Sequence, residues 1–322
     1  MNTVTLHLLK LALNGLMRLG PNSKRSNTID SLIINKTAHT KSTLSGDWQL
    51  RELYSETSKL THRYYYHHGP TPQAPVFLLL HGLFLDGRCF EKMHSLSQRF
   101  QLIAYDLPES SPIYRGDMND FKFLIDDFLD TLKIDKIYLC GVSFGGGIAL
   151  RYAASHARRV EILVLVSTFI MNITSDDRNK SRELAKTLLV HSDSKLQWLV
   201  KGVIKVSFTG NNREKKLLTH LLHLKHIDWY KQVVKSITTC EGSEDALQVK
   251  CPVLVLIGDN DRTVTESRAR LIPSLIPNAE LQIIKNGTHS MMYLQGSLIA
   301  DRIGRFCSRF DTTNVASFLK QA

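Results

Sequence analysis

The chain has 322 residues, of which 43% are hydrophobic and 22% charged. This composition is ordinary for a globular protein, and the length is sufficient to bury a substantial core. Five cysteines without C-x-x-C spacing argue against a disulfide framework or a metal site, and they favour a reducing compartment such as the cytoplasm. The net charge of +11 comes without a recognisable nucleic-acid-binding module. We therefore expect solvated basic surfaces and no nucleic-acid partner.

The positive charge is concentrated in two parts of the chain. Residues 1–74 carry 9 Lys and Arg against 4 Asp and Glu, and residues 169–250 carry 14 against 9. The two remaining blocks hold nearly equal numbers of each sign. We expect those remaining blocks to be close to neutral.

The first nineteen residues read as a helix with a narrow polar stripe on an apolar surface. The stripe is formed by His7, Lys10, Asn14 and Arg18. The apolar stretch is interrupted by Lys10 and is too short to span a bilayer, and no small-residue cleavage site clearly follows it. Three interpretations stay open: a helix packed on its own core or cap, peripheral membrane contact through residues 3–20, or an organellar targeting segment. Residues 20–46 are rich in Asn, Ser, Thr and Lys and are typical of a linker.

Eight later segments have the pattern of β-strands. In chain order they are Gln49–Tyr54, Thr61–His67, Pro75–Leu80, Gln101–Asp106, Ile137–Cys140, Ile162–Ser167, Val253–Ile257 and Leu281–Ile284. The first two alternate and predict antiparallel edge strands, whereas the uninterrupted apolar runs among the others are typical of buried parallel strands. An amphipathic helix is predicted at Asp120–Leu132, and the roughly 80 residues before Cys251 have the spacing of three or four helices, too many for a simple connection.

A serine stands on the turn after the fifth of these strands. Gly141-Val142-Ser143-Phe144-Gly145 has the pattern G-x-S-x-G between a strand and a small-residue helix. In this context the motif predicts a sharp turn that exposes the serine hydroxyl above the sheet edge. Gly141 and Gly145 are expected because a Cβ atom there would collide with the returning helix. Ser143 is therefore a candidate nucleophile.

An acid and a histidine follow in the order that such a serine requires. The seventh strand ends in Gly258-Asp259-Asn260-Asp261, and the eighth ends in Gly287-Thr288-His289. Both loops follow the carboxyl ends of strands, where open α/β sheets gather their ligands. Among thirteen histidines only His289 follows the last strand with a glycine nearby. Asp259 and Asp261 are both candidate acids on this reasoning. The pairs His67-His68 and His220/His223 are expected to face the surface or pack in the cap.

Together with the loop His81-Gly82-Leu83-Phe84, these motifs resemble the α/β-hydrolase superfamily from about Trp48 to Phe310. The resemblance implies an α/β fold with a mostly parallel central sheet flanked by helices, and a helical cap inserted after the sixth strand. The implied domains are an N-terminal helix and linker at 1–46, a core at 47–170 and 250–322, and a cap at 171–249.

The resemblance also implies roles for individual residues. Its G-x-x-D pattern places the acid at Asp261, with His289 as base and Ser143 as nucleophile. The backbone N–H groups of Phe144 and Leu83 would form an oxyanion hole, and His81 would brace the loop that carries Leu83.

The implied reaction is hydrolysis of a carboxylic ester, which includes lipid esters and thioesters, through an acyl-enzyme and without a metal or cofactor. A carbon–carbon bond hydrolase and a non-catalytic binding protein of the same fold are the alternatives. The substrate would be a small-molecule or lipid ester.

Overall fold

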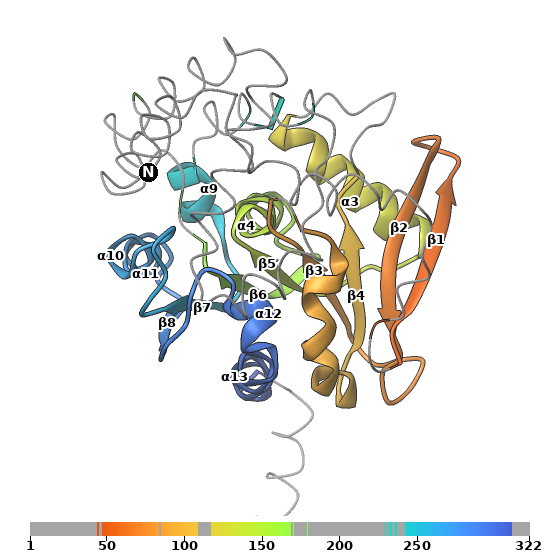
Figure 1. The fold of residues 1–322 in the computed structure, drawn as a ribbon. Coiled ribbons are helices and arrows are strands. Elements are labelled where there is room, and N and C mark those ends of the chain that lie inside the picture. Colours follow the sequence, from red (N-terminus) through yellow and green to blue (C-terminus); the bar gives the residue numbers. More distant parts are fainter. Residues whose placement is uncertain are drawn as a thin grey trace, which may run out of the picture.

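The computed structural model describes residues 44, 47–83, 85–108, 117–168, 170, 179, 229, 232–233, 236 and 242–310. These residues form one eight-stranded sheet with helices on both faces (Figure 1). The strands are β1 (Gln49–Ser55), β2 (Leu60–His67), β3 (Val76–Leu80), β4 (Gln101–Asp106), β5 (Ile137–Val142), β6 (Val160–Val166), β7 (Val253–Gly258) and β8 (Ala279–Ile284). The helices are η1 (Gly87–Gln98), α3 (Met118–Thr131), α4 (Phe144–Ser155), α9 (Gly242–Gln248), α10 (Glu266–Ala269), α11 (Leu271–Leu275), α12 (Met291–Leu294) and α13 (Gly296–Ser308).

The order of strands across the sheet is β1-β2-β4-β3-β5-β6-β7-β8. β2 pairs antiparallel with both β1 and β4, and every other neighbouring pair is parallel. The predicted antiparallel pair and the mostly parallel sheet are therefore confirmed, although β2 lies between β1 and β4, so that of this pair only β1 is an edge strand. Because parallel strands end at the same edge of a sheet, the loops after β3, β5, β7 and β8 meet at one edge.

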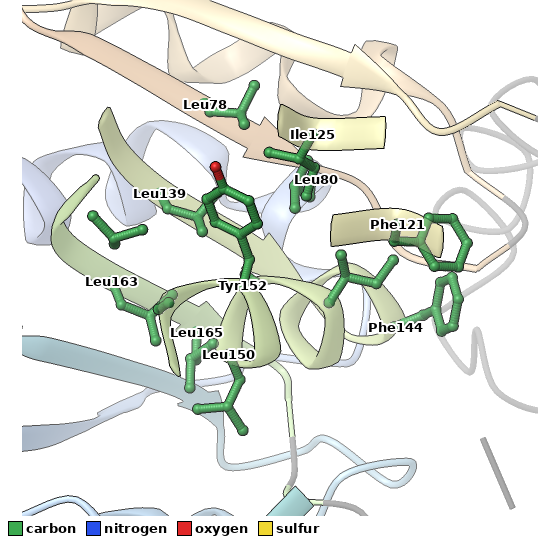
Figure 2. Packing of buried hydrophobic residues seen from close by; sticks show 14 of the residues in the cluster. Leu78, Leu80, Phe121, Ile125, Leu139, Phe144, Leu150, Tyr152, Leu163 and Leu165 are labelled. Atoms are coloured by element: carbon green, nitrogen blue, oxygen red, sulfur yellow. The ribbon is translucent and has the colours of Figure 1, made fainter. Parts of the chain in front are cut away.

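The central strands are apolar throughout because each buries both of its faces. In β3, Phe77 and Leu79 belong to one buried cluster, while Leu78 and Leu80 belong to the other. Figure 2 shows the second cluster, in which Leu78 and Leu80 face side chains of α3 and α4. The cluster beneath the opposite face contains residues of η1, α12 and α13. Each run of uninterrupted hydrophobicity in the sequence thus corresponds to a strand between two helical layers.

Helix α3 begins earlier than its apolar pattern predicts. The Asp117 carboxylate accepts the N–H of Asn119 at 2.8 Å, and the Asp120 carboxylate accepts the N–H of Asp117 at 3.1 Å, which together form a capping box. The first turn is therefore fixed by side-chain hydrogen bonds, which the spacing of the apolar residues does not predict.

A buried polar network ties the β1–β2 hairpin to α3. The His62 ring contacts the hydroxyl of Tyr105 at 2.7 Å through Nδ1 and the carboxylate of Asp127 at 2.8 Å through Nε2. The Ser55 hydroxyl donates to the other oxygen of Asp127 at 2.6 Å. The His62 side chain is fully buried, and burial lowers its pKa in spite of the neighbouring carboxylate.

One histidine lies elsewhere than expected. His68 is exposed, but His67 is buried with its ring in a T-shaped contact with Trp48, the centroids 5.4 Å apart. His67 lies on the face of the hairpin where Trp48 packs, and the edge-to-face arrangement of the two rings is one that aromatic side chains favour. The expectation of a surface-facing pair is thus wrong for His67.

Several predicted features fall partly or wholly outside the described residues. These are the N-terminal helix and linker at 1–46 apart from Leu44, most of the cap at 171–249, and Cys240, His220 and His223. Helix α9 lies within the predicted cap range and packs against α4. Across the described part of the chain, no helix is both long and apolar enough to cross a membrane. The four described cysteines, Cys89, Cys140, Cys251 and Cys307, are buried and free.

Candidate active site

Ser143 lies on the turn between β5 and α4, with φ 51° and ψ −113°. This left-handed backbone is costly for a residue with a side chain, by roughly 1–3 kcal/mol, and persists only when the surrounding structure holds it. The holding contacts are visible in the backbone. The Ser143 N–H donates to Val166 at 2.9 Å, and the Ser143 carbonyl accepts the N–H of Gly146 at 3.0 Å. The predicted sharp turn is present.

The two motif glycines are needed for different reasons. A Cβ atom on Gly141 would overlap the backbone of Gly145 and Gly146 at the start of α4, as the sequence predicts. A Cβ atom on Gly145 would instead overlap the carbonyl oxygens of Leu80 and His81 at the end of β3. The collision at Gly145 is therefore with a neighbouring strand that is over sixty residues away in the chain. Both positions exclude any larger residue.

The structure brings Ser143, His289 and Asp261 into one hydrogen-bonded line. His289 Nε2 lies 3.0 Å from Ser143 Oγ. His289 Nδ1 lies 3.0 Å from Asp261 Oδ2 and 3.2 Å from Oδ1. The Asp261 carboxylate is fully buried, and the His289 side chain is 9% exposed. Three residues separated by up to 146 positions thus meet at the edge where β5, β7 and β8 end.

Only one of the two candidate carboxylates faces the histidine. Asp259 is exposed, with its backbone N–H bonded to Ile284 at 3.1 Å. Asp261 Oδ1 accepts the backbone N–H groups of Thr263 at 2.9 Å and Val264 at 2.8 Å. These two bonds fix the plane of the carboxylate and leave Oδ2 directed at His289. The turn after β7 therefore orients Asp261 and leaves Asp259 in solvent.

The loop after β3 is held by His81. His81 is buried, and its Nδ1–H donates to the Gly82 carbonyl at 2.9 Å. Its Nε2 accepts the N–H of Leu107 at 3.0 Å. A donor at Nδ1 and an acceptor at Nε2 define a neutral imidazole. The ring thus joins the loop that carries Leu83 to the end of β4.

The two proposed oxyanion-hole residues, Leu83 and Phe144, belong to the loop after β3 and to the start of α4. Leu83 is half-buried and packs against the core, and an ideal Cβ placed on its neighbour Gly82 would lie 3.4 Å from the Cβ of Ser143. Phe144 is the first residue of α4, so its N–H belongs to the first turn, which has no acceptor within the helix. Phe144 directly follows Ser143 in the chain, and Gly82, the neighbour of Leu83, lies close to the Ser143 side chain.

Two aromatic side chains contact Phe144 beside the turn, and the sequence did not indicate the contact of Trp229. The ring of Phe144 contacts those of Phe121 on α3 and Trp229. Phe121 could be placed on the inner face of its helix, but no pattern around Trp229 indicates its contact. In the described ranges, no three His, Cys, Asp or Glu side chains lie close enough together to hold a metal ion.

The sequence profile of the Alpha/beta hydrolase family matches residues 77–302. The chain belongs to this family, and the predicted α/β-hydrolase fold is confirmed.

The relatives differ in their activities. Monoacylglycerol lipase ABHD6 of Bos taurus is 23% identical over 70% of this chain and 72% of its own. Non-heme chloroperoxidase CPO-A1 of Kitasatospora aureofaciens is 23% identical over 70% of this chain and 88% of its own. Among solved structures, the enol-lactonase from Burkholderia xenovorans LB400 has a TM-score of 0.66 at 19% identity, covering 80% of this chain and all of that one. A thermophilic esterase from Thermogutta terrifontis has the same TM-score and identity over 82% of this chain and all of its own. At these identities the structures show the shared fold alone.

Proposed function

We propose that this protein is a serine hydrolase that cleaves carboxylic esters through an acyl-enzyme intermediate, with Ser143, His289 and Asp261 as its catalytic triad. The observation that carries the proposal is the hydrogen-bonded line from Ser143 Oγ to His289 Nε2 and from His289 Nδ1 to Asp261. A nucleophile, a base and an orienting acid within hydrogen-bond reach are the arrangement that activates a serine hydroxyl.

Each residue then has one task. His289 Nε2 takes the proton from Ser143 Oγ as the oxygen attacks the ester carbonyl carbon. Asp261 keeps the remaining proton on Nδ1 and stabilises the imidazolium that forms. When the carbon–oxygen bond breaks, His289 returns its proton to the leaving alkoxide. The same base then takes a proton from water, which attacks the acyl carbon. As the bond between that carbon and Ser143 Oγ breaks, His289 returns the proton to Oγ, and the acid is released.

The negative charge that develops on the carbonyl oxygen needs hydrogen-bond donors. The backbone N–H groups of Phe144 and Leu83 are the proposed donors, and loss of one such donor costs roughly 3–4 kcal/mol in other enzymes. The neutral His81 would keep the Leu83 loop in place through its bond to Leu107. The oxyanion hole would thus be assembled from the ends of β3 and β5.

The proposed substrates are carboxylic esters, with lipid esters and thioesters included. The similarity to a monoacylglycerol lipase supports this class. A set of p-nitrophenyl esters of increasing acyl length, with a monoacylglycerol and an acyl thioester added, would define the preference.

The test is labelling by a fluorophosphonate probe together with Ser143→Ala. We expect the probe to add its mass to the peptide that contains Ser143. Ser143→Ala should unfold at the wild-type temperature, because alanine leaves the turn intact, and it should retain no more than about 10³–10⁴ of acceleration over water. Labelling without turnover of any ester would favour the carbon–carbon hydrolase. A wild-type protein that is neither labelled nor active would favour a binding protein and overturn the proposal.

A further inference from the structure

The ring of Phe144 lies between the nucleophile turn and two other parts of the chain. It makes T-shaped contacts with Phe121 on α3, centroids 5.6 Å apart at 80°, and with Trp229, 6.3 Å apart at 78°. Figure 2 shows the rings of Phe121 and Phe144 next to each other where α3 meets the start of α4. Phe144 is 6% exposed and Trp229 5%, so these rings fill the space between the elements. Rings in this geometry attract one another beyond their burial.

The part of the chain that contains Trp229 contacts the core at a second point, Ser236. Trp229, Val233 and Ser236 are each helical and buried, and intervals of four and three residues are those of one face of an α-helix. The Ser236 hydroxyl accepts the backbone N–H of Met118, the first residue of α3, at 2.6 Å. An N–H in the first turn of a helix has no acceptor within the helix, and Ser236 supplies one. This part of the chain therefore contacts the core at Trp229 and again at Ser236.

Phe144 is the single side chain through which the first turn of α4 can be held. The helix begins Phe144-Gly145-Gly146-Gly147. Three consecutive glycines stabilise a helix poorly and offer no side chain for packing. Ser143, directly before them, has a left-handed backbone that needs support from its surroundings. Packing of the Phe144 ring thus constrains the peptide that joins Ser143 to Phe144, which carries the proposed oxyanion donor.

We propose that Trp229 is a positioning residue for the oxyanion hole: by holding the Phe144 ring, it fixes the direction of the Phe144 N–H. This inference rests on the proposed function, since it assigns a consequence to that N–H. It also means that the stretch containing Trp229 contributes to catalysis without touching the reacting atoms.

The experiment compares Trp229→Ala with Trp229→Phe, and with Val233→Ala as a matched truncation on the same helix face. Two readouts are used: steady-state hydrolysis of p-nitrophenyl acetate and octanoate, and the second-order rate of labelling by the fluorophosphonate probe. The probe's phosphoryl oxygen also needs the oxyanion donors, and the labelling amplitude counts folded sites independently of the rate.

We expect Trp229→Ala to lower kcat and the labelling rate by about 10- to 100-fold, because a misplacement of about 1 Å near reacting groups has effects of that size. KM should change less than about twofold, and the loss should be equal for acetate and octanoate, since a donor acts on the carbonyl and not on the chain. Trp229→Phe should recover most of the rate, and Val233→Ala should stay within about threefold of wild type.

A cycle with Phe144→Leu tests the route of the effect. If Trp229 acts through the Phe144 ring, Trp229→Ala should add little in the Phe144→Leu background. Full additivity would overturn the proposal. An unchanged labelling rate with a reduced amplitude would also overturn it, because that result indicates a structural role for Trp229. A rise in KM alone, larger for the longer acyl chain, would overturn it too, because that result indicates that Trp229 forms a wall of the substrate pocket. A wild-type protein that the probe does not label refutes the proposed function instead, and the two failures are thereby distinguished.

Discussion

Replacement of Asp261 by asparagine tests the orientation of the proposed base. Asp261 Oδ1 accepts two backbone N–H groups, from Thr263 and Val264, and Oδ2 faces His289 Nδ1. In Asp261→Asn the amide oxygen must remain on the two N–H groups, because an NH₂ group there would set donor against donor. The NH₂ group then faces His289 and donates to Nδ1, which moves the ring proton to Nε2.

The consequence is an imidazole that donates to Ser143 Oγ instead of accepting its proton. In well-studied triads this change lowers turnover by about 10⁴, which corresponds to about 5.5 kcal/mol of transition-state stabilisation. The overall fold should not suffer, since the amide preserves the shape and the two backbone bonds. We therefore expect an unchanged unfolding temperature together with a loss of about 10⁴ in kcat.

Asp259→Asn is the matched control, because Asp259 is exposed and lies two residues away on the same loop. Its kcat for p-nitrophenyl acetate should stay within about twofold of wild type, as is usual for a surface substitution. The assay measures both variants at pH 8 beside the wild type. Equal impairment of the two variants, or a greater loss in Asp259→Asn, would refute the assignment of Asp261 as the orienting acid.

Two further predictions concern stability and the N-terminal segment. Burial holds the pKa of His62 below its ordinary value of 6.5. The unfolded chain therefore protonates His62 at a higher pH than the folded protein does. The free energy of unfolding should consequently fall as the pH drops below 6.5. His62→Gln should remove this pH dependence. The unfolding free energies of the variant and the wild type, measured in urea, should therefore differ less at pH 5 than at pH 7. The same difference at both pH values would show that His62 does not titrate. Deletion of residues 1–25 should leave hydrolysis of soluble esters intact and weaken binding to anionic vesicles, because we propose that residues 3–20 form an interfacial helix whose Lys10 and Arg18 meet anionic head groups. Aggregation or a lower unfolding temperature of the truncated protein would show instead that the segment packs on the rest of the chain.

The sequence alone determined the eight strands and their order along the chain. Continuous apolar runs predicted the central strands because strands between two helical layers bury both faces. The motif around Ser143 predicted the turn because so sharp a connection admits only glycine at Gly141 and Gly145. The positions of Asp261 and His289 after strands predicted that their side chains would gather at one sheet edge. These features are local or follow from topology, so a single sequence carries them.

The tertiary structure decided what depends on contacts between distant residues. It placed Asp261 against His289 and left Asp259 in solvent, because the turn after β7 aims two backbone N–H groups at only one of these carboxylates. It buried His67, where the sequence favoured the surface, because Trp48 folds over it. It brought Trp229 to Phe144, 85 positions away, through packing that no periodicity encodes. Periodicity states which face of an element is buried, whereas the partner across that face is set by how the whole chain packs.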